Sequence, residues 1–189
     1  MFTRVKSNQS GFTLVEILIT MAIFTTAMTT VANIFLLSNR SQRKTQALQT
    51  SESDARFALE VISQQVRRGN IDYAYYGGAI GANPQAVLAL LDNSGASVRF
   101  QRAVVDGRGV LQISQDSGVT WADLTPDDIS INAVAFYLSP TTNPFASPPL
   151  SQSQPLVTIV IDTSNTTPEG ATLSPTFLQT TISSRGYLR

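Results

Sequence analysis

The sequence of 189 residues contains no cysteine and no histidine. Without cysteine the chain has neither disulfides nor thiolate metal sites. The absence does not indicate whether the protein is in an oxidising or a reducing compartment. Without histidine it lacks the commonest general base and metal ligand, and every triad in which histidine takes the proton of serine or cysteine. These absences exclude the histidine-dependent enzyme classes.

The chain also lacks a net charge, because 13 basic residues balance 13 acidic ones. No overall attraction to nucleic acid or to an anionic membrane follows from this balance. The local distribution is uneven: residues 38–69 carry six basic and three acidic side chains, whereas 70–189 carry five basic and nine acidic ones. The length and the 42% hydrophobic content support one domain with a core.

Glycine and proline are missing between Phe12 and Arg68, and the first part of this stretch, Phe12–Leu37, is a long apolar run. Its only ionisable side chain is Glu16. As a helix the run would be about 39 Å long, which is enough to span a bilayer core. A cleavable secretory signal is the alternative, but its apolar stretch usually has about 7 to 15 residues and ends in a small-residue cleavage site. The run therefore predicts a membrane-spanning helix over 12–37.

Basic residues flank the apolar run on both sides. Arg4 and Lys6 favour a cytoplasmic N-terminus. Arg40, Arg43 and Lys44 follow the run and weaken this argument. Charge counting alone leaves the orientation open.

Glu16 is costly in such a helix, since a carboxylate near the membrane centre costs about 2.5 to 3.5 kcal/mol on insertion scales. Cleavage between Gly11 and Phe12 would create an ammonium four residues before Glu16, on the same face of a helix. This ammonium could neutralise the carboxylate within one chain or between neighbouring chains. A negative side chain in the first turn also suits the helix dipole. An interfacial glutamate in an uncleaved anchor is the alternative.

The segment Gly11-Phe12-Thr13-Leu14-Val15-Glu16, followed by the apolar run, resembles the class III signal of type IV prepilins. The resemblance implies that a prepilin peptidase cuts after Gly11 and that Phe12 becomes the N-methylated first residue. It also implies that Glu16 pairs with the N-terminus of a neighbouring subunit. The leader 1–11 would stay cytoplasmic, the helix would lie in the inner membrane, and the head would be periplasmic or extracellular. The implied partners are other pilin or pseudopilin subunits, an inner-membrane assembly platform and the lipid bilayer.

Residues 38–69 are expected to continue the helix, because no proline or glycine interrupts them before Gly69. A short soluble coiled coil is the alternative, but the apolar pattern lasts under three heptads. Glu52 and Arg56 have the spacing of a helical ion pair, and Gly69-Asn70 suggests a left-handed stop. Five residues have the spacing of one apolar face that packs against the head: Leu48, Ala55, Leu59, Ile62 and Val66.

Residues 70–189 are expected to form a head with one antiparallel sheet. The helix is expected to lie across one face of this sheet, which gives an α+β fold. Hairpin or tight-turn residues stand at 93–95, 106–109 and 116–118. The proline-rich segment 140–155 is expected to be an extended surface loop. The predicted strands are Ala86–Leu91, Ser97–Val105, Val110–Ser114, Ile129–Leu138, Leu156–Ile161 and Thr176–Ser183.

Two further patterns suggest binding chemistry in the head. Arg99, Arg102 and Arg108 near Phe100 are candidate contacts to DNA phosphates, with solvated strand arginines as the alternative. Trp121 is expected in the core or at an interface. Four aspartates could be offered as a calcium site, although their spacing matches no EF-hand loop and a solvated turn explains them as well: Asp116, Asp123, Asp127 and Asp128.

The stem SDARFALEVISQQVRRGN and the ending LQTTISSRGYLR resemble the larger minor pilins and pseudopilins of the J-like or W-like type. We therefore expect a non-catalytic minor subunit of a type IV pilus or of a type II secretion pseudopilus, with neither a cofactor nor a metal. Two alternatives stay open. One is a membrane-tethered extracellular binding module, and the other is a DNA- or surface-binding minor pilin of a competence pilus.

Overall fold

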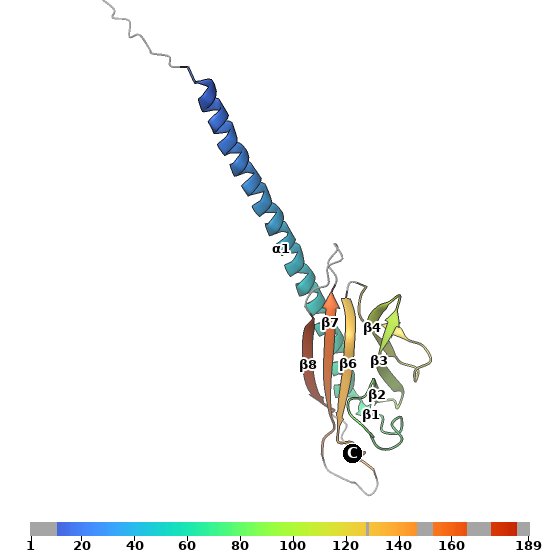
Figure 1. Cartoon of the computed structure of the whole chain (residues 1–189). Coiled ribbons are helices and arrows are strands. Elements are labelled where there is room, and N and C mark those ends of the chain that lie inside the picture. The colour runs from blue at the N-terminus through green and yellow to red at the C-terminus, as the bar shows by residue number, and fades with distance from the viewer. Residues whose placement is uncertain (1–10, 128, 147–152, 166–174, 185–189) are drawn as a thin grey trace, which may run out of the picture. The chain divides into compact units, whose positions relative to one another are not determined.

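The fold combines one long helix with antiparallel strands, as the α+β prediction requires (Figure 1). The computed structural model describes residues 11–127, 129–146, 153–165 and 175–184. Residues 1–10 of the predicted leader 1–11, Asp128, residues 147–152 of the predicted proline-rich loop and residues 185–189 of the C-terminal segment lie outside these ranges. The elements are α1 (Leu14–Arg68), β1 (Asn70–Ile71), β2 (Val87–Leu91), β3 (Ser97–Val105), β4 (Arg108–Ser114), β5 (Ala122–Asp123), β6 (Ile129–Ser139), β7 (Leu156–Asn165) and β8 (Thr176–Ser183).

Helix α1 belongs to two compact units, Met1–Lys44 and Thr45–Arg189. In the first unit nearly every described side chain is exposed. In the second unit one face of α1 is buried, as the apolar spacing predicted. Leu48 is half-buried, and the fully covered positions are Ser51, Ala55, Ala58, Leu59, Ile62, Ser63 and Val66.

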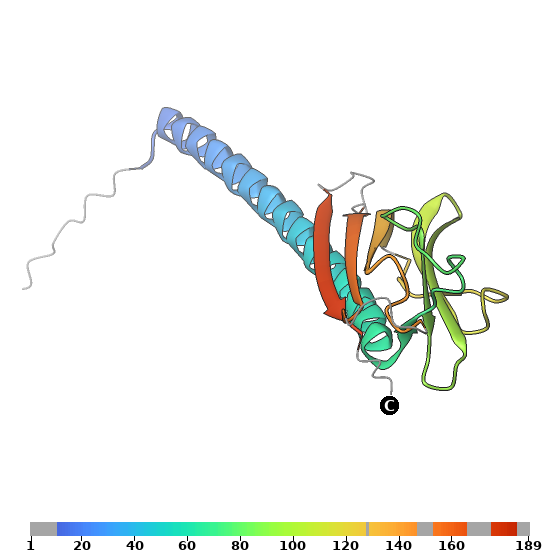
Figure 2. The same cartoon turned by 90° about the horizontal axis from the view of Figure 1, so that it is seen from below.

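The buried face of α1 joins a single hydrophobic core with both sets of strands. Phe100 in β3 and Phe136 in β6 are its largest fully buried side chains. Figures 1 and 2 both show the C-terminal part of α1 lying alongside β7 and β8. Ala55 and Ala58 are fully buried. Alanine side chains suit this buried face, because the close-packed core leaves little volume for larger side chains.

The strands divide over two antiparallel sheets, whereas one sheet was expected. The order is β1-β2-β3-β4-β5 in the first sheet and β6-β7-β8 in the second. All six predicted strands are present, and Ser97–Val105 and Thr176–Ser183 have the predicted bounds. Strands β1 and β5 were missed because two residues are too short to show an alternating pattern.

The β3–β4 hairpin turns at Asp106 and Gly107, where the sequence predicted a turn. Their φ angles are 51° and 79°, the left-handed values that a two-residue hairpin loop needs at both central positions. Gly95 and Gly118 also have positive φ, within the other two predicted turns. Local turn chemistry therefore determines these connections.

Gly69 ends the helix for a different reason from the one predicted. It is not among the described glycines with positive φ, so the left-handed stop was wrong. Instead, a Cβ at Gly69 would lie 2.5 Å from the carbonyl oxygen of Leu91. Its N–H still donates to the Gln65 oxygen at 2.8 Å. Close approach of the backbone to β2 is thus the reason for glycine here.

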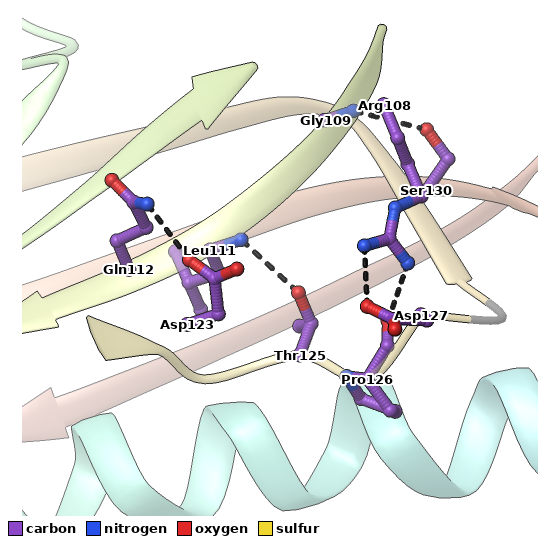
Figure 3. Close-up of polar contacts among 9 residues, drawn as sticks. All are labelled: Arg108, Gly109, Leu111, Gln112, Asp123, Thr125, Pro126, Asp127 and Ser130. Carbon is purple, nitrogen blue, oxygen red and sulfur yellow. Dashed lines mark hydrogen bonds and ion pairs between the residues drawn. The ribbon is translucent and has the colours of Figure 1, made fainter. Parts of the chain in front are cut away.

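The two sheets meet where β4 and β3 cross the start of β6 (Figure 3). A Cβ at Gly109 would overlap the carbonyl oxygen of Ile131, so only glycine fits without a shift of the backbone. Arg102 Nε donates to the same oxygen at 2.7 Å. The register of β6 with β7 also shifts between Ile131 and Ala133, which marks a bulge at this point.

Replacing Gly109 by alanine should lower the free energy of unfolding by about 1–3 kcal/mol, the usual cost of overpacking. The reason is the overlap of the new Cβ with the Ile131 carbonyl. Thermal and denaturant unfolding of the full-length protein in neutral detergent would measure the change.

Gly81→Ala is the matched control, because nothing lies within 4 Å of the Cβ position at Gly81. It should change stability by no more than about 0.5 kcal/mol. Equal effects of the two substitutions would contradict the close contact between β4 and β6.

Candidate functional site

The residues of the N-terminal motif that carry its chemistry lie just before and inside the first turn of α1. Gly11, Phe12 and Thr13 precede the helix, and no atom of the described residues lies within 4 Å of the Cβ position at Gly11. The Phe12 side chain is 78% exposed. The peptide bond between Gly11 and Phe12 is therefore in a non-helical segment next to the helix, where an enzyme can reach the backbone.

Thr13 caps the helix. The Glu16 N–H is 3.3 Å from Thr13 Oγ1, and the N–H groups of Glu16 and Ile17 also donate to the Thr13 carbonyl. Thr13-x-x-Glu16 is the sequence pattern of a capping box, in which the threonine is the N-cap and the glutamate is at N3. This pattern is the sequence signal that marks where the helix begins. Glu16 therefore has a fixed position in the first turn.

Phe12 lies outside the helix, so the helical spacing predicted for Phe12 and Glu16 is absent from this structure. The physical reason is the cap, because an N-cap residue has non-helical dihedrals and begins the helix after itself. Glu16 is exposed, and its charge lies at the positive end of the helix dipole. The carboxylate is thus free to meet a cation from outside α1.

An apolar surface follows Glu16 along the first unit. Large hydrophobic residues from Phe12 to Leu37 are between 47% and 78% exposed. Helix α1 is long and apolar enough to cross a membrane, and its most apolar window is not buried within the structure. A soluble protein would not leave so large a continuous apolar surface in water. This segment fits a membrane anchor.

Threonines interrupt this apolar surface without leaving unbonded hydroxyls. Thr20 donates to the Ile17 carbonyl at 2.9 Å and Thr25 to the Met21 carbonyl at 2.8 Å. Thr26, Thr29 and Thr30 also donate to carbonyls three or four residues earlier. These bonds satisfy the hydroxyls within the helix, so threonine is compatible with an apolar environment.

The three arginines proposed as DNA contacts do not form one cluster. Arg99 and Arg102 are three residues apart in β3, and side chains alternate between the faces of a strand, so the two point to opposite faces. Arg102 donates to the Ile131 carbonyl, whereas Arg108 Nη2 lies 2.6 Å from Asp127 Oδ1 and its Nη1 donates to the Pro126 carbonyl (Figure 3). Each described contact ties one part of the head to another.

The described aspartates of the proposed calcium cluster also have separate partners. Asp123 accepts from Gln112 Nε2 at 2.7 Å, and Asp127 pairs with Arg108 (Figure 3). Asp116 accepts from its own loop. Within the described ranges no group of three or more acidic residues is placed to hold a metal ion.

Asp116 organises the loop between β4 and β5. Its carboxylate accepts hydrogen bonds from the Thr120 hydroxyl and N–H, the Ser114 hydroxyl and the Val119 N–H. These bonds, the Thr120 hydroxyl above all, hold the pKa of Asp116 well below its ordinary value of 3.8. The carboxylate is the form that the folded loop prefers.

Asp116→Asn should lower the melting temperature at neutral pH, because the neutral amide accepts hydrogen bonds more weakly. The folded pKa is depressed, so the stabilisation is present above pH 3.8 and is lost as the pH falls below it. Melting curves of wild type and variant should therefore converge in acid. Asp123→Asn serves as the control, because Asp123 accepts a side-chain hydrogen bond from Gln112, whereas Asp116 accepts several within its loop. A constant difference at every pH would contradict this role of the charge.

One comparison with known proteins gave a match. Residues 6–32 match the prokaryotic N-terminal methylation motif. Searches of curated proteins and of solved structures gave no match. The motif implies processing by a prepilin peptidase and assembly with other pilin subunits, and together with the apolar helix it fits a membrane-anchored pilin. The chain therefore carries the class III signal of type IV prepilin-like proteins.

Proposed function

We propose that this protein is a structural, non-catalytic minor subunit of a type IV pilus or of a type II secretion pseudopilus. The observation that carries the proposal is the methylation motif, with Glu16 in the capped first turn of an exposed apolar helix. An antiparallel head on the same helix agrees with this function. The assignment as a minor subunit rests on the resemblance of the segments 51–70 and 178–189.

Maturation begins with hydrolysis of the peptide bond between Gly11 and Phe12. The peptidase removes the leader 1–11, which stays in the cytoplasm, and leaves an ammonium on Phe12. Glycine before the cut leaves room for the enzyme, since no described atom lies within 4 Å of its Cβ position. Methylation of the Phe12 nitrogen keeps its positive charge.

Glu16 then supplies the matching negative charge. In a poorly hydrated environment the carboxylate needs a partner, because an unpaired one costs about 2.5–3.5 kcal/mol near the centre of a membrane. The Phe12 ammonium of a neighbouring subunit is that partner. The pair fixes the axial register of adjacent helices, since only one offset brings the two charges together.

The exposed apolar side chains of 12–37 provide the packing surface. In the membrane they contact lipid, and in the filament they contact equivalent helices. Contacts of this head-to-tail kind do not close into a ring, so they produce a helical fibre. The second unit then lies on the periplasmic or extracellular side as the surface of the subunit.

Processing can be tested by intact-mass and N-terminal peptide spectrometry of the protein expressed with its own prepilin peptidase. Wild type and Glu16→Ala should both begin at methylated Phe12, because Glu16 acts after the cut. Gly11→Ala should keep the leader, because the class III signal implies that the peptidase recognises glycine itself before the bond. An intact Met1 terminus in all three proteins would favour a membrane-tethered module that keeps its anchor.

Incorporation can be tested separately with Glu16→Gln, which removes the charge and keeps the shape. Sheared filaments should contain at least about tenfold less of this variant than of wild type, since one lost charge pair in an apolar environment exceeds 1.4 kcal/mol. Membrane levels of the processed protein should be unchanged. The matched control Gln46→Glu adds a charge beyond the apolar run and should leave incorporation intact. Normal incorporation of Glu16→Gln would rule out the charge pair.

A further inference from the structure

A patch in the second unit has features of a binding site that no N-terminal signal explains. It consists of Tyr75, Arg99, Gly118, Val119 and Trp121, and we refer to it as the Arg99 patch. The guanidinium carbon of Arg99 lies 4.6 Å from the centre of the Tyr75 ring. A Cβ at Gly118 would lie 2.9 Å from Arg99 Nη1 and 3.6 Å from a ring carbon of Trp121. Three separate segments of the chain thus meet at one cation.

The aromatic side of the patch is held in place before any partner arrives. The Tyr76 hydroxyl donates to the Val87 carbonyl and accepts from the Ala89 N–H, both at 2.9 Å. The Tyr75 ring meets the Tyr76 ring edge-on, with 5.0 Å between their centres. Burial raises the pKa of Tyr76 well above its ordinary value, so its hydroxyl stays a donor. Tyr75 is therefore fixed to β2 through Tyr76.

The loop side of the patch is equally fixed. Trp121 Nε1 donates to the Gly118 carbonyl at 3.1 Å, and the Ser117 N–H donates to the Ser97 carbonyl in β3 at 3.2 Å. The Asp116 carboxylate also accepts hydrogen bonds from the N–H groups of Val119 and Thr120 in the same loop. A preorganised surface loses little conformational entropy when it binds a partner.

Arg99 differs from the other described arginines of the head. Arg102 donates to a backbone carbonyl and Arg108 pairs with Asp127. Among the described residues no carboxylate pairs with Arg99, and its Nε is buried without a hydrogen-bond partner. Contacts with Tyr75 and the Gly118 loop therefore position this guanidinium, and no described anion balances its charge.

We propose that the Arg99 patch binds a carboxylate from a partner protein, presented beside an apolar side chain. The planar guanidinium matches a carboxylate with two parallel hydrogen bonds. Tyr75 is 41% exposed and Val119 is 79% exposed, and they offer apolar contact next to the charge. Tyrosine, tryptophan and arginine are the residues that dominate protein–protein binding energy. One cation in a region of nine acidic and five basic residues suits a single carboxylate better than a nucleic acid.

Trp121 provides the measurement, because it is the only tryptophan in the chain. The full-length protein in neutral detergent would be titrated with N-acetyl-L-leucinate and, as the matched probe, with N-acetyl-L-leucinamide. The leucinate combines a carboxylate with an apolar side chain, whereas the amide lacks the charge. We expect a saturable change in tryptophan fluorescence with the leucinate and none with the amide.

Variants separate binding from folding. Arg99→Gln should weaken leucinate binding about tenfold or more, since hydrogen bonds to charged groups are among the strongest in proteins. Val119→Glu places a carboxylate on the residue that follows Gly118, which contacts Arg99, and should block the probe, whereas Val119→Gln should not. Arg56→Gln removes an exposed arginine on α1 and is the control for general charge. If Arg99→Gln fails to fold, the comparison of Val119→Glu with Val119→Gln tests the proposal instead.

Three results would overturn the proposal: no saturable change with the leucinate, an equal change with the amide, or an unchanged response in Arg99→Gln. A stronger response to inorganic phosphate or to a single-stranded oligonucleotide would overturn it too, in favour of a phosphate site. The titration does not require cleavage at Gly11 or assembly into a fibre. Its outcome is therefore separate from that of the proposed function.

Discussion

The packing of one face of α1 into the head is the interaction on which the second unit depends. Ala55, Ile62 and Val66 are fully buried in the same core as Phe100 and Phe136, one from each sheet. The three-stranded sheet alone would leave an apolar face in water, and so would the helix. Packing the helix against the sheets removes the apolar faces of both from solvent at once. The stability of the two sheets therefore depends on the helix.

The same helix presents a different surface in the first unit, where its apolar residues are exposed. Among the described residues no interaction within the chain covers this surface, and its length and composition fit a membrane anchor. Thr13 and Glu16 mark the start of this segment, with a cap that fixes the carboxylate at the end of the helix. The residues of α1 in the first unit therefore present an exposed apolar surface, whereas those in the second unit contribute a face to the core.

Three charged side chains of the head hold its strands and loops together. Arg108 joins the β5–β6 connection to β4 (Figure 3), Arg102 joins β3 to β6, and Asp116 closes the β4–β5 loop on itself. Arg99 stands apart because aromatic stacking, and no described anion, holds its guanidinium. A fixed cation beside exposed aromatic and aliphatic groups is the feature that suits recognition of another protein.

The sequence by itself determined the local features: the helix, the six longer strands, the turn at Asp106-Gly107 and the signal around Gly11 and Glu16. Each depends on residues near one another in the chain, so hydrophobic period, turn chemistry or a contiguous motif reveals it. Tertiary structure alone decided that the strands form two sheets, that Gly69 and Gly109 serve close backbone contacts, and that Arg99 meets Tyr75 and Gly118. Those features depend on pairs of residues far apart in sequence, and no local pattern specifies which distant segments will touch.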